Sequence, residues 1–136
     1  LSQRTLIDAL AITAAITASV ENEISGLYGV KSLVMETNFV YGSSGTTCKV
    51  WLQTSLDGGT NWIDVIQHDF ATTSARKVST IDVDAAATAV TPTDAALGAD
   101  AIVDGILGDR WRVKVTTTGT YAGSTTLSVH IVPKGA

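Results

Sequence analysis

Hydrophobic and polar residues alternate along most of this chain, and a period of two is typical of β-strands with one buried face. In residues 125–132, for example, Leu127, Val129 and Ile131 fall on one face and polar residues fall between them. Turns separate such runs, and Asp57-Gly58-Gly59 is the strongest hairpin signal, because glycine adopts the positive φ angles of tight turns. The clear runs are residues 31–41, 47–55, 62–70, 75–83, 110–117 and 125–132.

The number and spacing of these runs predict the fold class. About seven or eight short strands at roughly ten-residue spacing are typical of an antiparallel β-sandwich or a jelly-roll-like barrel. No stretch has the strand–helix–strand pattern of a parallel sheet. A chain of 136 residues is long enough to bury one hydrophobic core. We therefore expect a single all-β domain over residues 1–136.

Two segments depart from the alternating pattern. In residues 5–19 the alanines favour a helix, whereas Ile12, Thr13 and Ile16 are β-branched and favour strands. Because everything downstream is β, we favour strands and interpret residues 1–25 as an extended N-terminal segment. Residues 84–109 lose the pattern and predict a long loop, which in a compact domain is usually functional or carries short structure of its own.

Composition and charge exclude several classes of protein. A chain with 45% hydrophobic and 16% charged residues is not intrinsically disordered. A net charge of −4 without a basic cluster argues against nucleic acid and anionic membranes as partners. The most apolar stretch, residues 6–20, contains polar residues, falls short of a spanning helix and lacks the basic start of a signal peptide. The single Cys48 excludes an internal disulfide framework and a cysteine-based zinc site.

No residue pattern points to catalysis or to a cofactor. We interpret His68 and His130 as partly exposed strand residues, because no further ligand lies at a metal-binding spacing. Cys48 lies on an apolar strand face and reads as a buried, inert thiol. The glycine-rich residues 42–45 precede a strand, whereas a phosphate-binding loop precedes a helix. Acidic residues in and near the long loop read as solvated turn-capping groups rather than a calcium site: Asp82, Asp84, Asp94, Asp100, Asp104 and Asp109. We expect no enzyme activity, no metal and no cofactor.

The outward-facing residues of two runs are candidates for a partner interface. If Val50 and Leu52 face the core, Trp51 faces outward. An outward Trp is a candidate subunit contact or sugar-stacking platform, although cover by a loop or by the N-terminal segment accounts for it equally well. A basic row on the outer face of residues 110–117 could orient an acidic partner: Arg110, Arg112 and Lys114.

The segment Ser55-Leu56-Asp57-Gly58-Gly59-Thr60-Asn61-Trp62 resembles the Asp-box hairpin, Ser-x-Asp-x-Gly-x-Thr-Trp, with Asn61 in place of the threonine. The resemblance implies that Ser55 and Asp57 bind the turn through their side chains, around Gly59, and that Trp62 packs beneath it. This hairpin occurs in sialidases and in many unrelated β proteins, so a single copy implies a folding device and no glycosidase activity.

A wider resemblance covers about two thirds of the chain, from Gln53 onward. Its segments are residues 53–64, 72–78, 90–94, 104–110 and 119–127. In this order they resemble a family of small virion structural proteins of tailed bacteriophages and related prophages. The resemblance implies a component of the phage particle.

Three functions follow from that resemblance as hypotheses. The first is a capsid decoration (cement) protein on the outer surface of the capsid, which bridges major capsid protein subunits and assembles with itself as a trimer or another homo-oligomer. The second is a neck, tail or fibre module that binds a host-surface glycan through Trp51 or Tyr121. An Asp-box hydrolase is the least favoured.

Overall fold

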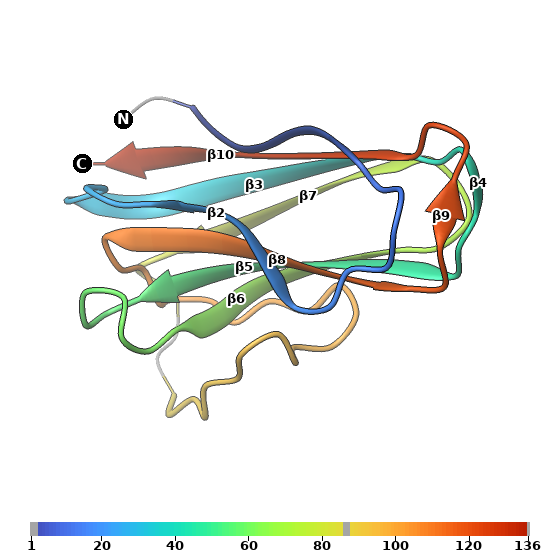
Figure 1. Ribbon diagram of the computed structural model, residues 1–136. Coiled ribbons are helices and arrows are strands. Elements are labelled where there is room, and N and C mark those ends of the chain that lie inside the picture. Colours follow the sequence, from blue (N-terminus) through green and yellow to red (C-terminus); the bar gives the residue numbers. More distant parts are fainter. Residues whose placement is uncertain (1–2, 86–87, 136) are drawn as a thin grey trace.

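The computed structural model describes residues 3–85 and 88–135, and within them the chain forms ten strands and no helix. Two four-stranded antiparallel sheets face each other (Figure 1). The first sheet consists, in spatial order, of β1 (Arg4–Ala11), β10 (Thr126–Gly135), β3 (Val30–Val40) and β7 (Ala75–Asp82). The second consists of β2 (Ser19–Ile24), β8 (Arg110–Thr118), β5 (Thr47–Ser55) and β6 (Ile63–Phe70). A two-stranded ribbon of β4 (Ser43–Ser44) and β9 (Tyr121–Ala122) closes one end.

The order in which the chain visits the two sheets makes this sandwich a jelly roll. The chain crosses from one sheet to the other after β1, β2, β3, β6, β7 and β8. Only β5 and β6 follow each other within one sheet. Such repeated crossing between two antiparallel sheets defines the jelly-roll connection. The predicted all-β fold, an antiparallel sandwich or jelly roll in a single domain, is confirmed. In the described part of the chain no helix is long and apolar enough to span a membrane.

The N-terminal region departs from the expected extended segment. Its described residues form β1 at the edge of the first sheet and β2 at the edge of the second, and the buried side chain of Ile12 lies in the crossing between them. Strands in residues 5–19 were expected, but β2 was not. Val20 and Ile24 are its apolar residues, and neither is buried, so an edge strand of this kind leaves almost no hydrophobic period in the sequence.

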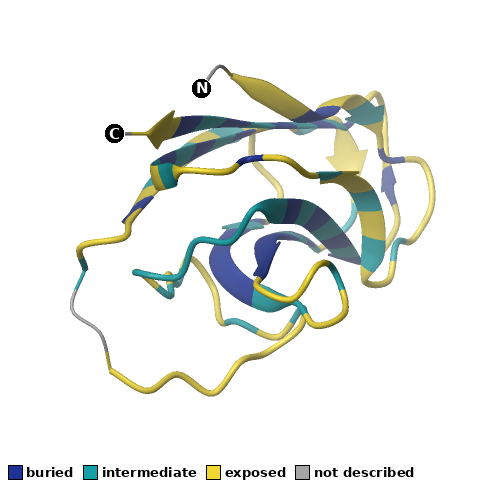
Figure 2. Ribbon diagram, turned by 90° about the vertical axis from the view of Figure 1, so that its left-hand side faces the viewer, coloured by how far each residue is buried: buried dark blue, intermediate teal, exposed yellow. Residues whose placement is uncertain are grey.

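The core lies between the sheets and consists of the residues that alternate inward. Phe39, near the end of β3, packs in this core with its ring centroid 5.1 Å from that of Phe70 and 5.5 Å from that of Tyr121. Burial follows the predicted period of two on β3, β8 and β10, as the alternating bands of Figure 2 show. Cys48 is fully buried in this core, and burial raises its pKa to about 12, so the thiol stays protonated.

His68 lies inside the sandwich, and the expectation that it is partly exposed is wrong. Its ring is 2% exposed, with Nδ1 2.8 Å from Oγ1 of Thr37 and Nε2 2.8 Å from Oγ of Ser79 on the opposite sheet. A neutral imidazole donates at one nitrogen and accepts at the other, and each hydroxyl can take the complementary role. Burial lowers the pKa of His68 to about 4, while the charges of Asp100 and Lys77 act in opposite directions.

His130, in contrast, faces outward on β10. Its side chain is 31% exposed, and Nε2 lies 3.2 Å from Oε1 of Glu36 on the neighbouring strand. This placement agrees with the expected partly exposed strand residue.

The pKa of His68 predicts acid sensitivity. The unfolded chain binds a proton at this ring near the ordinary pKa of 6.5, whereas the folded chain does so only near 4. The free energy of unfolding is therefore unaffected by His68 above pH 6.5 and falls as the pH drops from 6.5 to 4, by up to about 1 kcal/mol per pH unit. We expect His68→Gln to flatten this slope in urea unfolding series at several pH values. His130→Gln, which keeps the buried ring, serves as the control, and an equal slope in wild type and His68→Gln would contradict the assignment.

Candidate functional site

The described residues of the loop that follows β7 (88–109) cover one edge of the second sheet and part of its outer face. Asp64 N donates to Thr93 O at 3.0 Å, Gln67 N donates to Ala101 O at 3.0 Å, and Val103 N donates to Val65 O at 2.8 Å. The loop thus supplies backbone partners to β6, which would otherwise be an open edge strand. The expectation of a long loop with short structure of its own agrees with this arrangement.

The carboxylate of Asp64 fastens this loop. Asp64 is 1% exposed and accepts hydrogen bonds from the backbone N–H groups of Ala95, Ala96 and Leu97 at 2.9, 2.9 and 3.1 Å. It also accepts from Oγ1 of Thr93 at 2.8 Å. Three successive amides that converge on one carboxylate form a concave anion-binding turn, here filled by a side chain of the same protein.

A second carboxylate joins the loop to the outer face of the second sheet. Asp94 accepts hydrogen bonds from Nζ of Lys114 at 2.7 Å and from Nε2 of Gln53 at 2.6 Å, and it lies 3.3 Å from the Arg112 guanidinium. The amide oxygen Oε1 of Gln53 accepts from Nε of Arg112 at 2.6 Å. Partial burial acts to raise the pKa of Asp94, but the hydrogen bonds from Lys114 and Gln53 outweigh it and hold that pKa below its ordinary value.

The basic row is therefore not the free cationic surface that the sequence suggested. The side chains of Arg112 and Lys114 are each 14% exposed, and both pair with the carboxylate of Asp94 from the loop. Arg110 is more accessible, with a side chain 37% exposed and 3.8 Å from Glu23. A partner that approached this face would meet Arg110 and the loop.

Neither aromatic residue expected to contact a glycan lies on the surface. Trp51 is 4% exposed, and its Nε1 donates to Leu97 O at 3.0 Å, so the loop covers it. Of the interpretations that the sequence left open, cover by a loop is the one observed, and a partner contact at Trp51 would require the loop to move. Tyr121 is 1% exposed and its hydroxyl donates to Ala71 O at 2.7 Å.

The hairpin between β5 and β6 contains the side-chain contacts that the motif resemblance implied. Oγ of Ser55 accepts from Gly59 N at 2.9 Å, and Oδ1 of Asp57 accepts from Asn61 N at 2.9 Å. Asn61 also donates through Nδ2 to Oδ2 of Asp57 at 2.6 Å, a contact supplied by the residue that departs from the motif. The backbone and side-chain hydrogen bonds from Asn61, and then the one from Ser55, lower the pKa of Asp57 to about 2. The turn is preorganised around a carboxylate that stays ionised.

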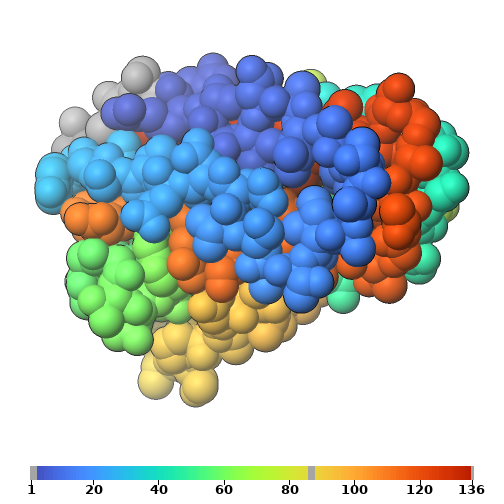
Figure 3. Space-filling model, viewed as in Figure 1, coloured from blue at the N-terminus to red at the C-terminus, as the bar shows by residue number. Residues whose placement is uncertain are grey.

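Trp62 lies beside a surface hollow at the base of the hairpin. The Arg112 guanidinium lies 4.3 Å from the centroid of the Trp62 ring and covers one side of it, and Nε1 donates to Gly59 O at 3.1 Å. A hollow of about 480 Å³ opens beside the ring, where the hairpin and the loop meet on the lower surface of Figure 3. Its lining residues are Leu56, Asp57, Asn61, Trp62, Ile63, Pro92, Thr93 and Asp94.

This hollow was not foreseen from the sequence. Trp62 was expected to pack beneath the hairpin, and Trp51 was the aromatic residue expected on the surface. One residue in the sequence could have indicated this hollow. Leu56 is an apolar residue at the tip of a predicted hairpin, and it is 63% exposed in the structure.

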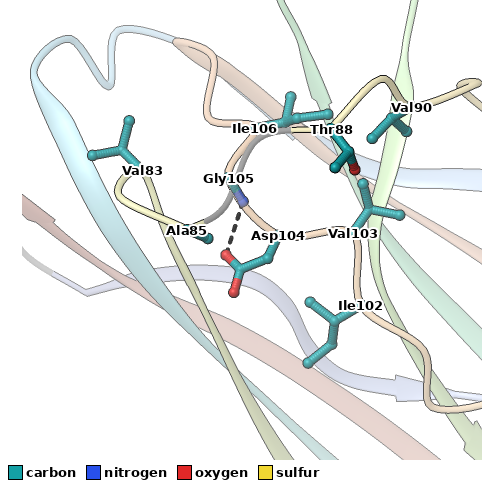
Figure 4. Close-up of a pocket in the computed structure, with 9 residues that line it drawn as sticks. All are labelled: Val83, Ala85, Thr88, Val90, Ile102, Val103, Asp104, Gly105 and Ile106. Atoms are coloured by element: carbon teal, nitrogen blue, oxygen red, sulfur yellow. Dashed lines mark hydrogen bonds between the residues drawn. The ribbon is translucent and has the colours of Figure 1, made fainter.

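A further hollow of about 350 Å³ lies between the end of β7 and the loop (Figure 4). Val83, Val90 and Ile102 line it and are each more than a third exposed. Asp104 is the charged residue among those drawn; its Oδ1 accepts from Gly105 N at 2.8 Å and from Asp82 N at 2.7 Å. Polar and apolar groups both line the hollow, and its carboxylate is already engaged in holding the backbone.

Several acidic side chains in and near the loop bind other parts of the same chain. Asp100 binds Nζ of Lys77 at 2.8 Å, and Oδ1 of Asp82 accepts from Asp84 N at 2.8 Å. Within residues 3–85 and 88–135 no group of three or more metal-ligating side chains lies close enough to bind an ion. These contacts agree with the turn-capping role expected from the sequence.

Comparison with known proteins shows the fold but no family. No family model and no curated protein matches the sequence. A chain of the T13 IBDV viral particle is similar over 98% of this chain, with a TM-score of 0.52 and 14% identity, and this chain spans 30% of it. Two further solved structures are less similar. A structure from work on CBM4 structure and function has a TM-score of 0.38 and 10% identity, over 83% of this chain and 59% of that chain. Eiger TNF from S. frugiperda has a TM-score of 0.37 and 10% identity, over 89% of this chain and 70% of that chain.

The buried carboxylate of Asp64 predicts how the loop is released. Asp64→Asn keeps the size of the side chain but replaces one acceptor oxygen by an N–H₂ group that faces the loop amides. We expect a loss of about 2 to 4 kcal/mol in the free energy of unfolding. We also expect faster hydrogen exchange at the amides of Ala95, Ala96, Leu97 and Val103.

Asp104→Asn is the matched control, because this carboxylate also binds two backbone amides, those of Asp82 on β7 and Gly105 in the loop, but lies at the surface. It should leave exchange at residues 95–97 unchanged. Unchanged protection of these amides in Asp64→Asn would show that the loop is held by other contacts.

Proposed function

We propose that this chain is a structural protein of a bacteriophage virion, most favourably a capsid decoration protein that bridges major capsid protein subunits on the outer surface. The observation that supports this role most is the jelly-roll fold, because 98% of this chain is similar in structure to part of a chain of a viral particle. Jelly rolls also serve in lectin domains and enzymes, so the fold narrows the role without determining it. The ordered resemblance of residues 53–127 to small phage virion proteins is the second support.

The physical properties of the domain suit a mechanical role. Most backbone partners come from strands distant in sequence, and the long loop is bound at Asp64, Asp94 and Asp100 rather than free. A domain in which the longest loop is held at several points opens locally less often and offers proteases few sites. Such rigidity stabilises a shell that must resist internal pressure. We propose no catalytic step and no cofactor.

The number of copies in the particle tests this role directly. We expect this chain in purified virions at a ratio to the major capsid protein near one, or at a simple fraction set by occupancy of the symmetry axes. Quantitative mass spectrometry with labelled peptides of both proteins measures this ratio. Capsids from a deletion strain should break at lower temperature, and added protein should restore them.

A tail protein of known copy number in the same particles provides the calibration. A handful of copies per particle would contradict the decoration role and place the chain in the neck or tail. Absence from the particle would overturn the virion assignment itself.

The hollow beside Trp62 favours a second candidate function, a neck, tail or fibre module that binds a host-surface glycan. Because Trp51 and Tyr121 are buried, this hollow replaces them as the site. An aromatic ring presents an apolar face to the C–H groups of a sugar, and the carboxylates of Asp57 and Asp94 and the amide of Asn61 provide acceptors and a donor for hydroxyl groups. Its volume of about 480 Å³ is in the range of small-ligand sites.

Binding of host-derived oligosaccharides tests this candidate. We expect Trp62→Ala to weaken binding at least about tenfold, because the stacking surface is lost, whereas Trp62→Phe retains most of it. Isothermal titration with oligosaccharides released from the host cell wall measures the affinity. Trp51→Phe is the control beneath the loop and should bind like wild type. Equal affinity of wild type and Trp62→Ala, or no binding at all, would remove the glycan role.

A further inference from the structure

The two sheets of the sandwich have four edge strands, and they differ in how their free backbone is protected. β1 and β7 flank the first sheet, and β2 and β6 flank the second. An edge strand carries a row of unpaired N–H and C=O groups that can pair with another strand, so proteins usually distort or cover such edges.

Three of the four edges are distorted or covered. β1 has two shifts of register against β10, and Ala9 within it has a φ of +49°. β2 has one shift of register, between Val20 and Asn22. The long loop covers β6, as described above. Bulges and covering segments are the ordinary means by which an edge avoids pairing.

β7 is regular and uncovered by comparison. It pairs with β3 without any shift of register, from Ser32 opposite Asp82 to Phe39 opposite Ala75. At its end Val83 N donates to Lys31 O, toward β3, whereas Asp82 N donates to Asp104 Oδ1, away from β3. N–H groups alternate in direction along a strand, so the groups of Arg76, Val78 and Thr80 also point away from β3. Within residues 3–85 and 88–135 none of these three donates to another group outside the sheet.

The side chains of β7 are exposed in the same alternating way. Val78 is 56% exposed, although it lies in the middle of a strand, and the Arg76 side chain is 68% exposed. Ala75, Lys77 and Ser79 face the other sheet but are only half-buried. A strand added beside β7 would cover these residues.

We propose that β7 pairs with β7 of a second copy of this chain, antiparallel and with a two-fold axis through Val78. This register joins the outward-pointing groups of Val78 to those of Val78 in the second copy, and those of Arg76 to those of Thr80, on both sides of the axis. Each of the three positions offers one donor and one acceptor, so the pairing closes about six hydrogen bonds between chains. Asp82, whose N–H is already bound to Asp104, is not required.

Charge and apolar character along β7 are self-complementary in this register. The exposed Val78 side chains meet across the axis as an apolar pair, and such cross-strand pairs stabilise a sheet. Arg76 is the second residue of β7 and Asp82 is its last, so in the antiparallel arrangement Arg76 of one copy lies diagonally across from Asp82 of the other, within reach of a long side chain. A parallel arrangement would place like charges together.

The pairing joins the two first sheets into one sheet of eight strands and leaves the second sheets, with the loop and the hollow beside Trp62, free for other contacts. It does not depend on the proposed function, because it involves purified chain alone. A contact made by one edge strand is small, so we expect a dimer that dissociates on dilution.

Sedimentation velocity of the purified wild-type chain over a range of about 10 µM to 1 mM tests the pairing. We expect a shift toward twice the monomer mass with rising concentration. Val78→Pro removes one outward N–H but leaves the β3 ladder intact, and should weaken association at least about tenfold. Val78→Lys should do the same by placing two charges at the axis. Val20→Lys is the matched control, a valine on the edge strand β2 that is 43% exposed, and should associate like wild type.

The register has a test of its own. Arg76→Glu should weaken the dimer, because it faces Asp82 of the second copy, and the further change Asp82→Lys should restore it. Circular dichroism and thermal unfolding confirm that each variant is folded. A wild-type chain that stays monomeric up to about 1 mM would overturn the proposal, as would a dimer that Val78→Pro and Val78→Lys leave intact. Loss of the dimer in Val20→Lys would place the contact at β2 and also overturn it.

Discussion

A carboxylate removed from water must be matched by donors, and in this protein most of the donors to Asp64 come from a loop that has no regular structure of its own. Nε2 of Gln53 on β5 supplies one more, at 2.7 Å. Three consecutive amides and one hydroxyl of residues 93–97 bind the side chain, which lies on the outer side of β6. A buried charge without these partners would cost several kcal/mol. The loop is therefore ordered by the sheet, and the sheet can keep its buried carboxylate only with the loop in place.

Most features of the outer face of the second sheet depend on this arrangement. With residues 95–97 held at Asp64, Leu97 covers Trp51 and Asp94 lies between Arg112 and Lys114. The loop then continues along β6 and closes that edge. The same arrangement leaves β7, in the other sheet, as the regular edge, so one carboxylate contributes to which surfaces of the domain are available to partners.

The two proposed roles use different parts of this domain. A decoration protein needs a rigid body with adhesive surfaces, and the jelly roll with its fastened loop has the required rigidity. A glycan-binding module needs a preorganised concave site, and the hairpin held by Ser55, Asp57 and Asn61 fixes the wall of such a site beside Trp62. Arg112 belongs to both arrangements, since it binds Gln53 and Asp94 while it packs against the Trp62 ring. The loop and the hairpin are thus one structural unit.

The sequence by itself determined the strands and the direction of their inner side chains, because a period of two is a local property of the chain. Trp111, Val113 and Val115 are fully buried as their alternation predicts, and Thr37, which alternates in step with Leu33, Met35 and Phe39, is also buried although it is polar. The alternation did not predict β2, because the sequence of this edge strand shows little alternation of apolar and polar residues. Contacts between residues far apart in sequence determined the surroundings of the polar side chains. Thr37 and Ser79 hydrogen-bond to the buried ring of His68, and Asp94 pairs with Arg112 and Lys114. Local alternation says which face of a strand a residue occupies, but only the packed loop and the opposite sheet decide what covers that face.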